Sequence, residues 1–156
     1  TRASIIGRWG EKMVKPMQLG HANIRVSDVE RAERFYTDVL GLYVTQRRGT
    51  TVFLSLRDHS HELAIRAMGP EAQPADKSLV GTNHFAREMG SFEDLQAMYD
   101  HLKEMDVKIL GTRNNSYSVG VYFNDPDGNG NEVYFEETGG WRQGEWGGTY
   151  HRTLED

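Results

Sequence analysis

The sequence predicts an α+β fold built from two copies of a βαβββ module, and three observations carry this prediction. First, a shift of 63 residues lays the pattern that starts at His21 over the pattern that starts at His84. Second, in each copy a strand-like segment follows the histidine and leads into a segment with apolar residues at helical spacing. Third, three further strand-like runs follow each helix. Each copy is therefore expected to form a strand, a helix and three strands.

In the first copy, residues 19–26 alternate as a strand would, and an amphipathic helix follows. The apolar face of this helix is formed by Val29, Ala32, Phe35, Tyr36 and Val39. Ser27 and Glu30 have capping-box spacing, so Ser27 is the predicted N-cap, and Gly41 is predicted to end the helix. The strand-like runs after the helix are residues 42–45, 51–56 and 61–67.

The second copy keeps the helical periodicity of the first. The shift pairs Val29, Ala32, Phe35 and Tyr36 with Phe92, Leu95, Met98 and Tyr99. Its strand-like runs are residues 107–110, 119–123 and 132–136. Because the two copies match in element order and in apolar positions, we expect two similar modules.

We expect one domain over residues 1–156. Its parts are an N-terminal arm (1–16), module one (17–68), a linker (69–81), module two (82–137) and a C-terminal tail (138–156). Glycine and proline among polar residues mark the linker. The tail is rich in glycine and tryptophan, and we expect irregular structure anchored by Trp141, Trp146 and Tyr150.

Composition limits the possible functions. Hydrophobic residues make up 37% of the 156 positions and charged residues 26%, as in soluble globular proteins. No apolar run is long enough to span a membrane, so we expect a cytoplasmic protein without a membrane partner. A net charge of −5 argues against a nucleic-acid partner, since such proteins are normally basic. The sequence has no cysteine, so a bound metal must use His, Asp or Glu.

Three residues are candidate metal ligands. His21 and His84 occupy the same position in the two copies, and Glu132 follows the turn formed by residues 125–128. Taken alone, each histidine fits a hydrogen-bonded structural role better. Their shared repeat position favours a metal site, because two imidazoles and one carboxylate suit non-haem iron with open coordination positions.

The most specific stretch is Tyr122-Phe123-Asn124-Asp125-Pro126-Asp127-Gly128-Asn129-Gly130-Asn131-Glu132-Val133-Tyr134-Phe135. Together with the duplicated βαβββ order, it resembles the signature of the vicinal-oxygen-chelate superfamily. That superfamily includes glyoxalase I, bleomycin-resistance proteins and extradiol ring-cleaving dioxygenases. The resemblance covers about residues 17–137 and implies two modules that form a half-open barrel around a metal site.

Two segments are similar to the catechol 2,3-dioxygenase branch, namely Asn131-Glu132-Val133-Tyr134 and His61-Glu62-Leu63-Ala64-Ile65. This resemblance implies an extradiol-type dioxygenase that acts on a catecholic aromatic and dioxygen. Fe(II) would be bound by His21, His84 and Glu132. His61 would act as the acid/base, and Tyr122 would hydrogen-bond the bound catecholate.

Asn115 is a departure from that branch, whose members often have a histidine in this loop. An asparagine there can donate a hydrogen bond to substrate, but it cannot shuttle a proton at neutral pH. Asn115 is therefore a candidate substrate-binding residue only.

Two alternatives remain at this point. Strand parity suggests Glu62 as the repeat partner of Glu132, and the resulting four-ligand set would hold Zn or Ni. The ligands would be His21, Glu62, His84 and Glu132, as in a glyoxalase I-like lyase, isomerase or epimerase. Mn is a further possible metal.

The other alternative is a binding protein of the bleomycin-resistance type, which performs no reaction. The short sheets with exposed edges make a homodimer plausible in every case.

Overall fold

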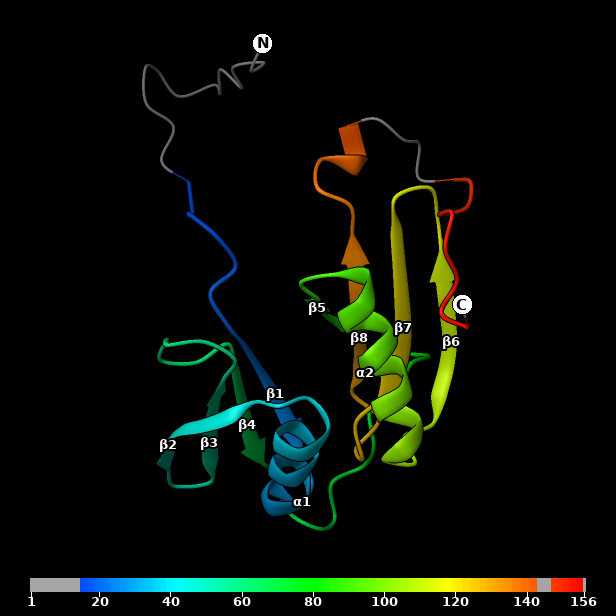
Figure 1. Ribbon diagram of the computed structural model, residues 1–156. Coiled ribbons are helices and arrows are strands. Elements are labelled where there is room, and N and C mark those ends of the chain that lie inside the picture. The colour runs from blue at the N-terminus through cyan, green and yellow to red at the C-terminus, as the bar shows by residue number, and fades with distance from the viewer. Residues whose placement is uncertain (1–14, 143–146, 156) are drawn as a thin grey trace.

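The computed structural model describes residues 15–142 and 147–155, and it contains two four-stranded sheets, each accompanied by its own helix (Figure 1). The first module comprises β1 (Ala22–Val26), α1 (Val29–Arg34), the π-helical η1 (Phe35–Val39), β2 (Tyr43–Arg48), β3 (Thr51–Ser55) and β4 (Leu63–Ala67). The second comprises β5 (Phe85–Glu88), α2 (Phe92–Glu104), β6 (Ile109–Asn114), β7 (Ser118–Asn124) and β8 (Gly130–Glu136), followed by the short η2 (Gly140–Arg142). The predicted βαβββ order is confirmed in both copies.

The two sheets have the same topology. Their strand orders are β1-β4-β3-β2 and β5-β8-β7-β6. In each sheet the first strand pairs in parallel with the last, and the other pairs are antiparallel. A register shift interrupts the outer strand in both, between Val44 and Gln46 in β2 and between Ile109 and Gly111 in β6. The sheets remain open, as expected for a half-open arrangement of two α+β modules.

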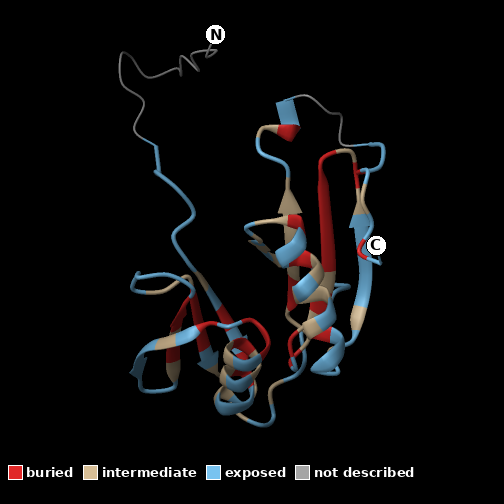
Figure 2. Cartoon of the chain, viewed as in Figure 1, coloured by how far each residue is buried: buried red, intermediate tan, exposed pale blue. Residues whose placement is uncertain are grey.

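The core lies between the sheets and the helices. Leu54 and Ile65 of the first module are fully buried, as are Val121 and Phe123 of the second. Figure 2 shows the buried residues running along the central strand β7. Alternating apolar positions place these side chains on one face of each strand, which is why the periodicity located the strands.

The first helix starts differently from the prediction. Asp28 is its N-cap, because its Oδ1 accepts hydrogen bonds from the backbone N–H groups of Glu30 and Arg31. Ser27 instead donates its hydroxyl hydrogen bond to Asp127, 2.5 Å away in the second module. The predicted end is confirmed: the helical segment stops at Val39, and Gly41 follows with φ +70°.

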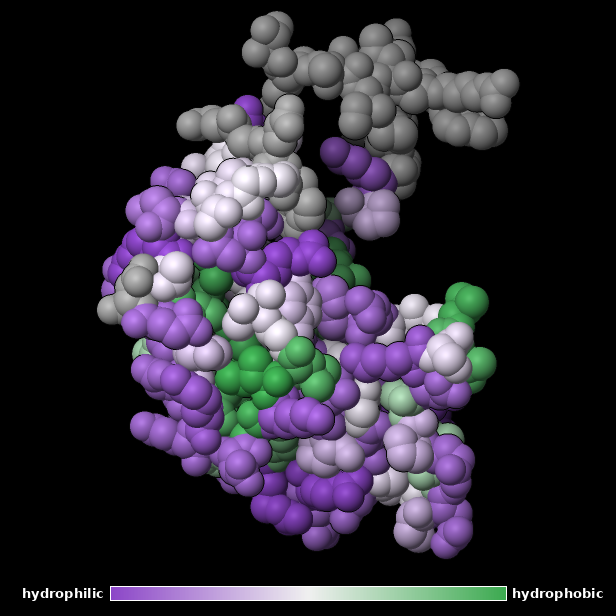
Figure 3. Space-filling view, turned by 90° about the vertical axis from the view of Figure 1, so that its right-hand side faces the viewer, coloured by the Kyte–Doolittle hydropathy of each residue, from purple (hydrophilic) through white to green (hydrophobic). Residues whose placement is uncertain are grey.

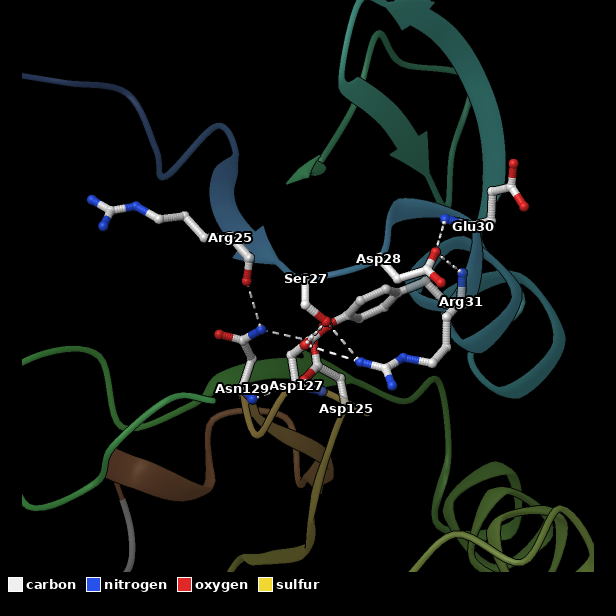
Figure 4. Close-up of polar contacts among 9 residues, drawn as sticks. Arg25, Ser27, Asp28, Glu30, Arg31, Asp125, Asp127 and Asn129 are labelled. Atoms are coloured by element: carbon white, nitrogen blue, oxygen red, sulfur yellow. Dashed lines mark hydrogen bonds and ion pairs between the residues drawn. The ribbon is translucent and has the colours of Figure 1, made fainter. Parts of the chain in front are cut away.

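A polar network joins the two modules at the turn before β8 (Figure 4). Asp127 accepts hydrogen bonds from Ser27 and from Arg31, the latter at 3.0 Å. Asn129 donates through Nδ2 to the backbone carbonyl of Arg25, 3.1 Å away. The end of β1 is therefore held against the turn that leads into β8.

The most buried part of this network is the hydrogen bond from Tyr36 to Asp125. The hydroxyl of Tyr36 lies 2.9 Å from Asp125 Oδ2, and both residues are buried. Burial raises the pKa of Asp125, while its hydrogen bonds from Asn129, Tyr36 and Asp127 oppose that rise. Three further hydrogen bonds to Asp125 come from the backbone of Asp127 and from the backbone and side chain of Asn129. Asp125 thus ties the first module's helical segment to the turn.

Replacing Tyr36 with phenylalanine is expected to lower the free energy of unfolding by about 1–3 kcal/mol, because a buried carboxylate oxygen loses a donor. Urea denaturation measures this loss. Tyr99→Phe is the matched control, since that hydroxyl makes only a 3.4 Å contact to the exposed Glu155. The control is expected to change stability by less than about 0.5 kcal/mol. Equal losses in the two variants would contradict the role given to the Tyr36 hydroxyl.

The C-terminal tail packs against the second module. Tyr150 is buried, and its ring lies 5.7 Å from that of Phe92 and 6.0 Å from that of Phe135. Trp141 was expected to be a second anchor, and this is wrong because the side chain is 59% exposed. Trp146 lies outside the described residues. From the side that carries β6 and the tail, the surface is mainly hydrophilic, with an apolar area near the centre of the view (Figure 3).

No helix in residues 15–142 and 147–155 has the length and apolar character to cross a membrane.

Candidate functional site

Two of the three candidate metal ligands lie in contact in the second module. His84 Nε2 is 3.0 Å from Glu132 Oε2, and both side chains are partly exposed. His84 directly precedes β5, and Glu132 is the third residue of β8, which pairs with β5 in parallel. The opposite nitrogen of the imidazole, Nδ1, lies 3.3 Å from Asn83 Nδ2. Contacts on both sides therefore orient the ring so that Nε2 faces the carboxylate.

Tyr122 lies beside this pair. It is the register partner of Glu132 across β7 and β8, and its ring centroid is 5.4 Å from that of His84. Partial burial, together with the hydrogen bond and charge of Glu132, raises the pKa of Tyr122 to about 12. Its hydroxyl is therefore protonated at neutral pH and can donate a hydrogen bond.

His21 and His61 form a second pair in the first module. Their ring centroids are 4.4 Å apart, and the ring of Phe53 lies 4.9 Å from His61. Partial burial and the neighbouring charges of His21 and His59 lower the pKa of His61. His61 is half-buried, so it is more enclosed than a freely exposed residue at a strand end.

The structure does not bring these two pairs together within one chain. Across the described residues, no group of three His, Asp or Glu side chains could hold a metal ion. The strand β1 explains the separation. Ser27 follows the last residue of β1 and is hydrogen-bonded to the turn before β8, whereas His21 precedes the first residue of β1. Six residues of extended chain span roughly 20 Å.

His84 lies near the end of β1 that is farther from His21. A Cβ atom added to Gly130, the first residue of β8, would come within 3.2 Å of the Cα atom of His84. The chain entering β5 is therefore close to the turn that holds the end of β1. His84 lies near that end of β1, and His21 lies at the opposite end.

Glu62 is not the structural equivalent of Glu132, although strand parity suggested that it was. The β1–β4 register aligns Asn23 with Ala64, and the β5–β8 register aligns Ala86 with Glu132. Since Asn23 and Ala86 are 63 residues apart, Ala64 is the equivalent of Glu132, two residues beyond Glu62. Parity identified the face of the strand correctly but not the position along it.

The carboxylate of Glu62 is bound within its own module. It accepts hydrogen bonds from the hydroxyl of Ser55 at 2.6 Å, from the backbone of Leu56 at 2.9 Å and from Arg57 Nε at 2.7 Å. These bonds outweigh the opposing effect of burial and lower the pKa of Glu62 to about 2. A carboxylate with these partners is a poor candidate for a fourth metal ligand.

Asn115 is buried and shapes the turn between β6 and β7. Its Oδ1 accepts hydrogen bonds from the backbone N–H groups of Tyr117, at 3.2 Å, and Ser118, at 3.0 Å. These contacts give it a clear structural role at the turn.

Gly120 is a site residue that sequence reasoning missed. A Cβ atom added to it would lie 2.4 Å from Oε1 of Glu132, so the glycine leaves the space that the carboxylate occupies. The available signal was a glycine inside the strand-like run 119–123, since such glycines often mark a close approach.

The His84–Glu132 pair has two donor groups of the kinds that bind divalent metals, and Tyr122 lies beside it. One neutral imidazole and one carboxylate are suitable ligands for a divalent ion such as Fe(II), Zn or Ni. The hydroxyl of Tyr122 is a hydrogen-bond donor beside these two side chains.

Comparison with known proteins identifies a family and several relatives. The model of the Glyoxalase/Bleomycin resistance protein/Dioxygenase superfamily matches residues 18–133. The catechol-2,3-dioxygenase of Bacillus subtilis (strain 168) is 30% identical over 117 residues, which cover 74% of this chain and 40% of that protein. The biphenyl-2,3-diol 1,2-dioxygenase 2 of Rhodococcus globerulus is 22% identical over 117 residues, covering 75% of this chain and 62% of that protein. The chain thus spans less than two thirds of each relative.

A solved structure supports the fold. The glyoxylase/bleomycin resistance protein/dioxygenase domain from Frankia sp. EAN1pec superposes with a TM-score of 0.68 at 20% identity. The match covers 80% of this chain and 96% of that one. The arrangement of both modules is therefore shared with a protein of very different sequence.

Proposed function

The chain belongs to the Glyoxalase/Bleomycin resistance protein/Dioxygenase superfamily, and we propose that it is a metal-dependent enzyme, an extradiol-type ring-cleaving dioxygenase acting on a catecholic aromatic. The observation that carries the proposal is the 3.0 Å contact between His84 Nε2 and Glu132 Oε2, with Tyr122 beside both. Both relatives described above are named as dioxygenases of aromatic diols, and this supports the choice of substrate class.

His21 is the proposed third ligand, and a second copy of the chain would supply it. Within one chain His21 precedes the start of β1, whereas His84 precedes β5 and lies near the turn that holds the end of β1, so one cation cannot bind both. A two-fold axis can place the His21 half of one copy against the His84 half of the other, and it does so twice in a dimer. The homodimer is thereby part of the functional proposal, and each dimer would hold two sites.

The remaining side chains would handle protons and orientation. Fe(II), when bound by His21, His84 and Glu132, supplies open coordination positions and the one-electron chemistry that dioxygen requires. Tyr122 would donate its hydroxyl hydrogen bond to a substrate oxygen and so orient the ring. His61, 4.4 Å from His21 between ring centroids, would accept the proton of a substrate hydroxyl and later return it.

Oxygen uptake tests this function. Anaerobically prepared protein supplied with ferrous ion is expected to consume oxygen when a catechol is added, and to form a ring-opened product that absorbs at longer wavelength than the catechol. Resorcinol, whose hydroxyls are not adjacent, is the matched control and is expected to give no uptake. Oxygen-independent isomerisation of a carbonyl substrate, with no uptake for any catechol, would overturn the proposal.

Replacing Gly120 with alanine is expected to weaken metal binding by about tenfold or more. The new methyl group would occupy the place of Glu132 Oε1 and push the carboxylate away from His84. Because that oxygen ends a flexible side chain, the free energy of unfolding is expected to change little. Isothermal titration calorimetry measures the metal affinity, and urea denaturation measures the free energy of unfolding.

Gly111→Ala is the control for this variant. A Cβ atom at Gly111 would meet no other atom within 4 Å, and its backbone does not require glycine. Metal affinity is expected to remain at the wild-type value. An unchanged affinity in Gly120→Ala would show that the Glu132 carboxylate is not a ligand in this position.

A further inference from the structure

A cavity of about 490 Å³ lies on the opposite side of the second sheet from the His84–Glu132 pair. Arg87 and Val133, which are register partners on β5 and β8, both line it. Their neighbours Ala86 and Glu132 are also register partners, and alternation along a strand directs those side chains to the other face. The cavity is therefore separate from the proposed metal site.

Arg87 occupies a position where the first module has a core residue. The shift of 63 residues pairs it with Ile24, which is only 5% exposed and packs in the core. Replacing a buried isoleucine by arginine at an equivalent position places a charged group where the fold otherwise requires an apolar one. Such a charge is costly unless it finds partners.

The partners of Arg87 within the chain are incomplete. Its Nη1 donates to Asn131 Oδ1 at 2.9 Å, and its Cζ atom lies 5.6 Å from the ring centroid of Tyr36. None of the ion pairs found in the described part of the chain includes Arg87. The charge of Glu62 acts on it, but that carboxylate is already bonded to Arg57.

The rest of the cavity is largely apolar, with charges at exposed positions. Leu40 and Leu56 line it from the first module, and Met89 and Met98 line it from the second. Glu88 and Asp94 also line it, but both are exposed, and the Asp94 carboxylate already accepts a hydrogen bond from Ser91 at 2.8 Å. Arg87 is half-buried, and solvent screens its charge less than the charges of the exposed Glu88 and Asp94, so Arg87 sets the charge preference of the cavity interior.

We propose that this cavity binds a small organic carboxylate with an apolar body, with the carboxylate paired to Arg87. Guanidinium groups match carboxylates in geometry, and a charge-assisted pair is strongest where water is excluded. The leucine and methionine side chains would enclose the apolar part of the ligand.

Methyl NMR of methionine-labelled protein tests the proposal with phenylacetate as the probe. The Met89 and Met98 methyl resonances are expected to shift on titration, whereas those of the exposed Met17 and Met68 stay fixed. Phenethylamine has a similar body but a positive charge, and it is expected to leave all four unchanged. Binding of phenethylamine in place of phenylacetate would overturn the proposal.

Two variants assign the binding to this cavity. Arg87→Gln is expected to weaken phenylacetate binding by at least about tenfold, whereas Arg66→Gln, which alters an exposed arginine, is expected to leave it unchanged. Met98→Trp keeps Arg87 and fills the cavity, so the Met89 resonance is expected to stop responding. Unchanged binding in Met98→Trp contradicts the proposal, even if Arg87→Gln fails to fold.

Discussion

A mixed dimer, with His21→Ala in one chain and His84→Ala in the other, is expected to bind iron and take up oxygen at about half the wild-type level. Each variant alone is expected to have neither property. In the mixed dimer one site loses both histidines, while the other receives an intact His21 and an intact His84 from different chains. Two affinity tags on co-expressed chains allow the mixed dimer to be purified and its iron to be measured.

A second pair of variants provides the matched control. His84→Ala and Glu132→Ala alter the same half of the site, where the two side chains are 3.0 Å apart. Both sites of that mixed dimer contain one altered ligand, so neither iron binding nor oxygen uptake is expected. If the first mixed dimer stays inactive although wild-type protein is active and the variants fold, the site is built within one chain.

Replacing His61 with alanine is expected to lower turnover about 100- to 10,000-fold while iron content stays near the wild-type value. The imidazole contacts His21 and Phe53 but is not a proposed ligand, so its loss removes proton transfer without removing the metal site. Iron analysis and steady-state oxygen uptake separate the two effects. A loss confined to turnover is the signature of an acid/base.

His59→Ala is the control for that experiment. His59 is exposed and acts on His61 only through a minor charge effect on its pKa, so its replacement is expected to leave iron content unchanged and to change turnover far less than His61→Ala does. Activity retained in His61→Ala would refute the proposed role. Iron lost from His61→Ala would instead assign His61 to the metal site.

The order of elements could be predicted because it depends on local patterns. The apolar positions Ala32, Tyr36 and Leu95 recur at helical spacing and are all buried. Gly41 ends the first helical segment with a positive φ, which glycine adopts without strain. Periodicity and turn residues were sufficient for these features.

Contacts between distant segments could not be predicted in this way. Ser27 and Asp28 are both good N-caps, and Asp127, far away in sequence, takes the Ser27 hydroxyl and leaves Asp28 to cap the helix. The register of β4 likewise depends on how it pairs with β1 and β3, so parity alone could not distinguish Glu62 from Ala64.

The candidate site shows the same limit. The local pattern identified His84 and Glu132, which the structure brings into contact. The local pattern could not show that His21 lies apart from these two residues within one chain. The position of His21 relative to His84 depends on how the two modules pack. Hydrogen bonds that link Asp125, Asp127 and Asn129 to the first module fix this packing.

Metal analysis of anaerobically purified protein decides whether His21, His84 and Glu132 together bind iron. About one iron atom per chain is expected, and it should be lost on replacement of His21, His84 or Glu132, since two imidazoles and one carboxylate bind it. Stoichiometric zinc or nickel that Glu62→Gln removes would contradict this expectation, as would the same iron content in His84→Ala as in the wild type.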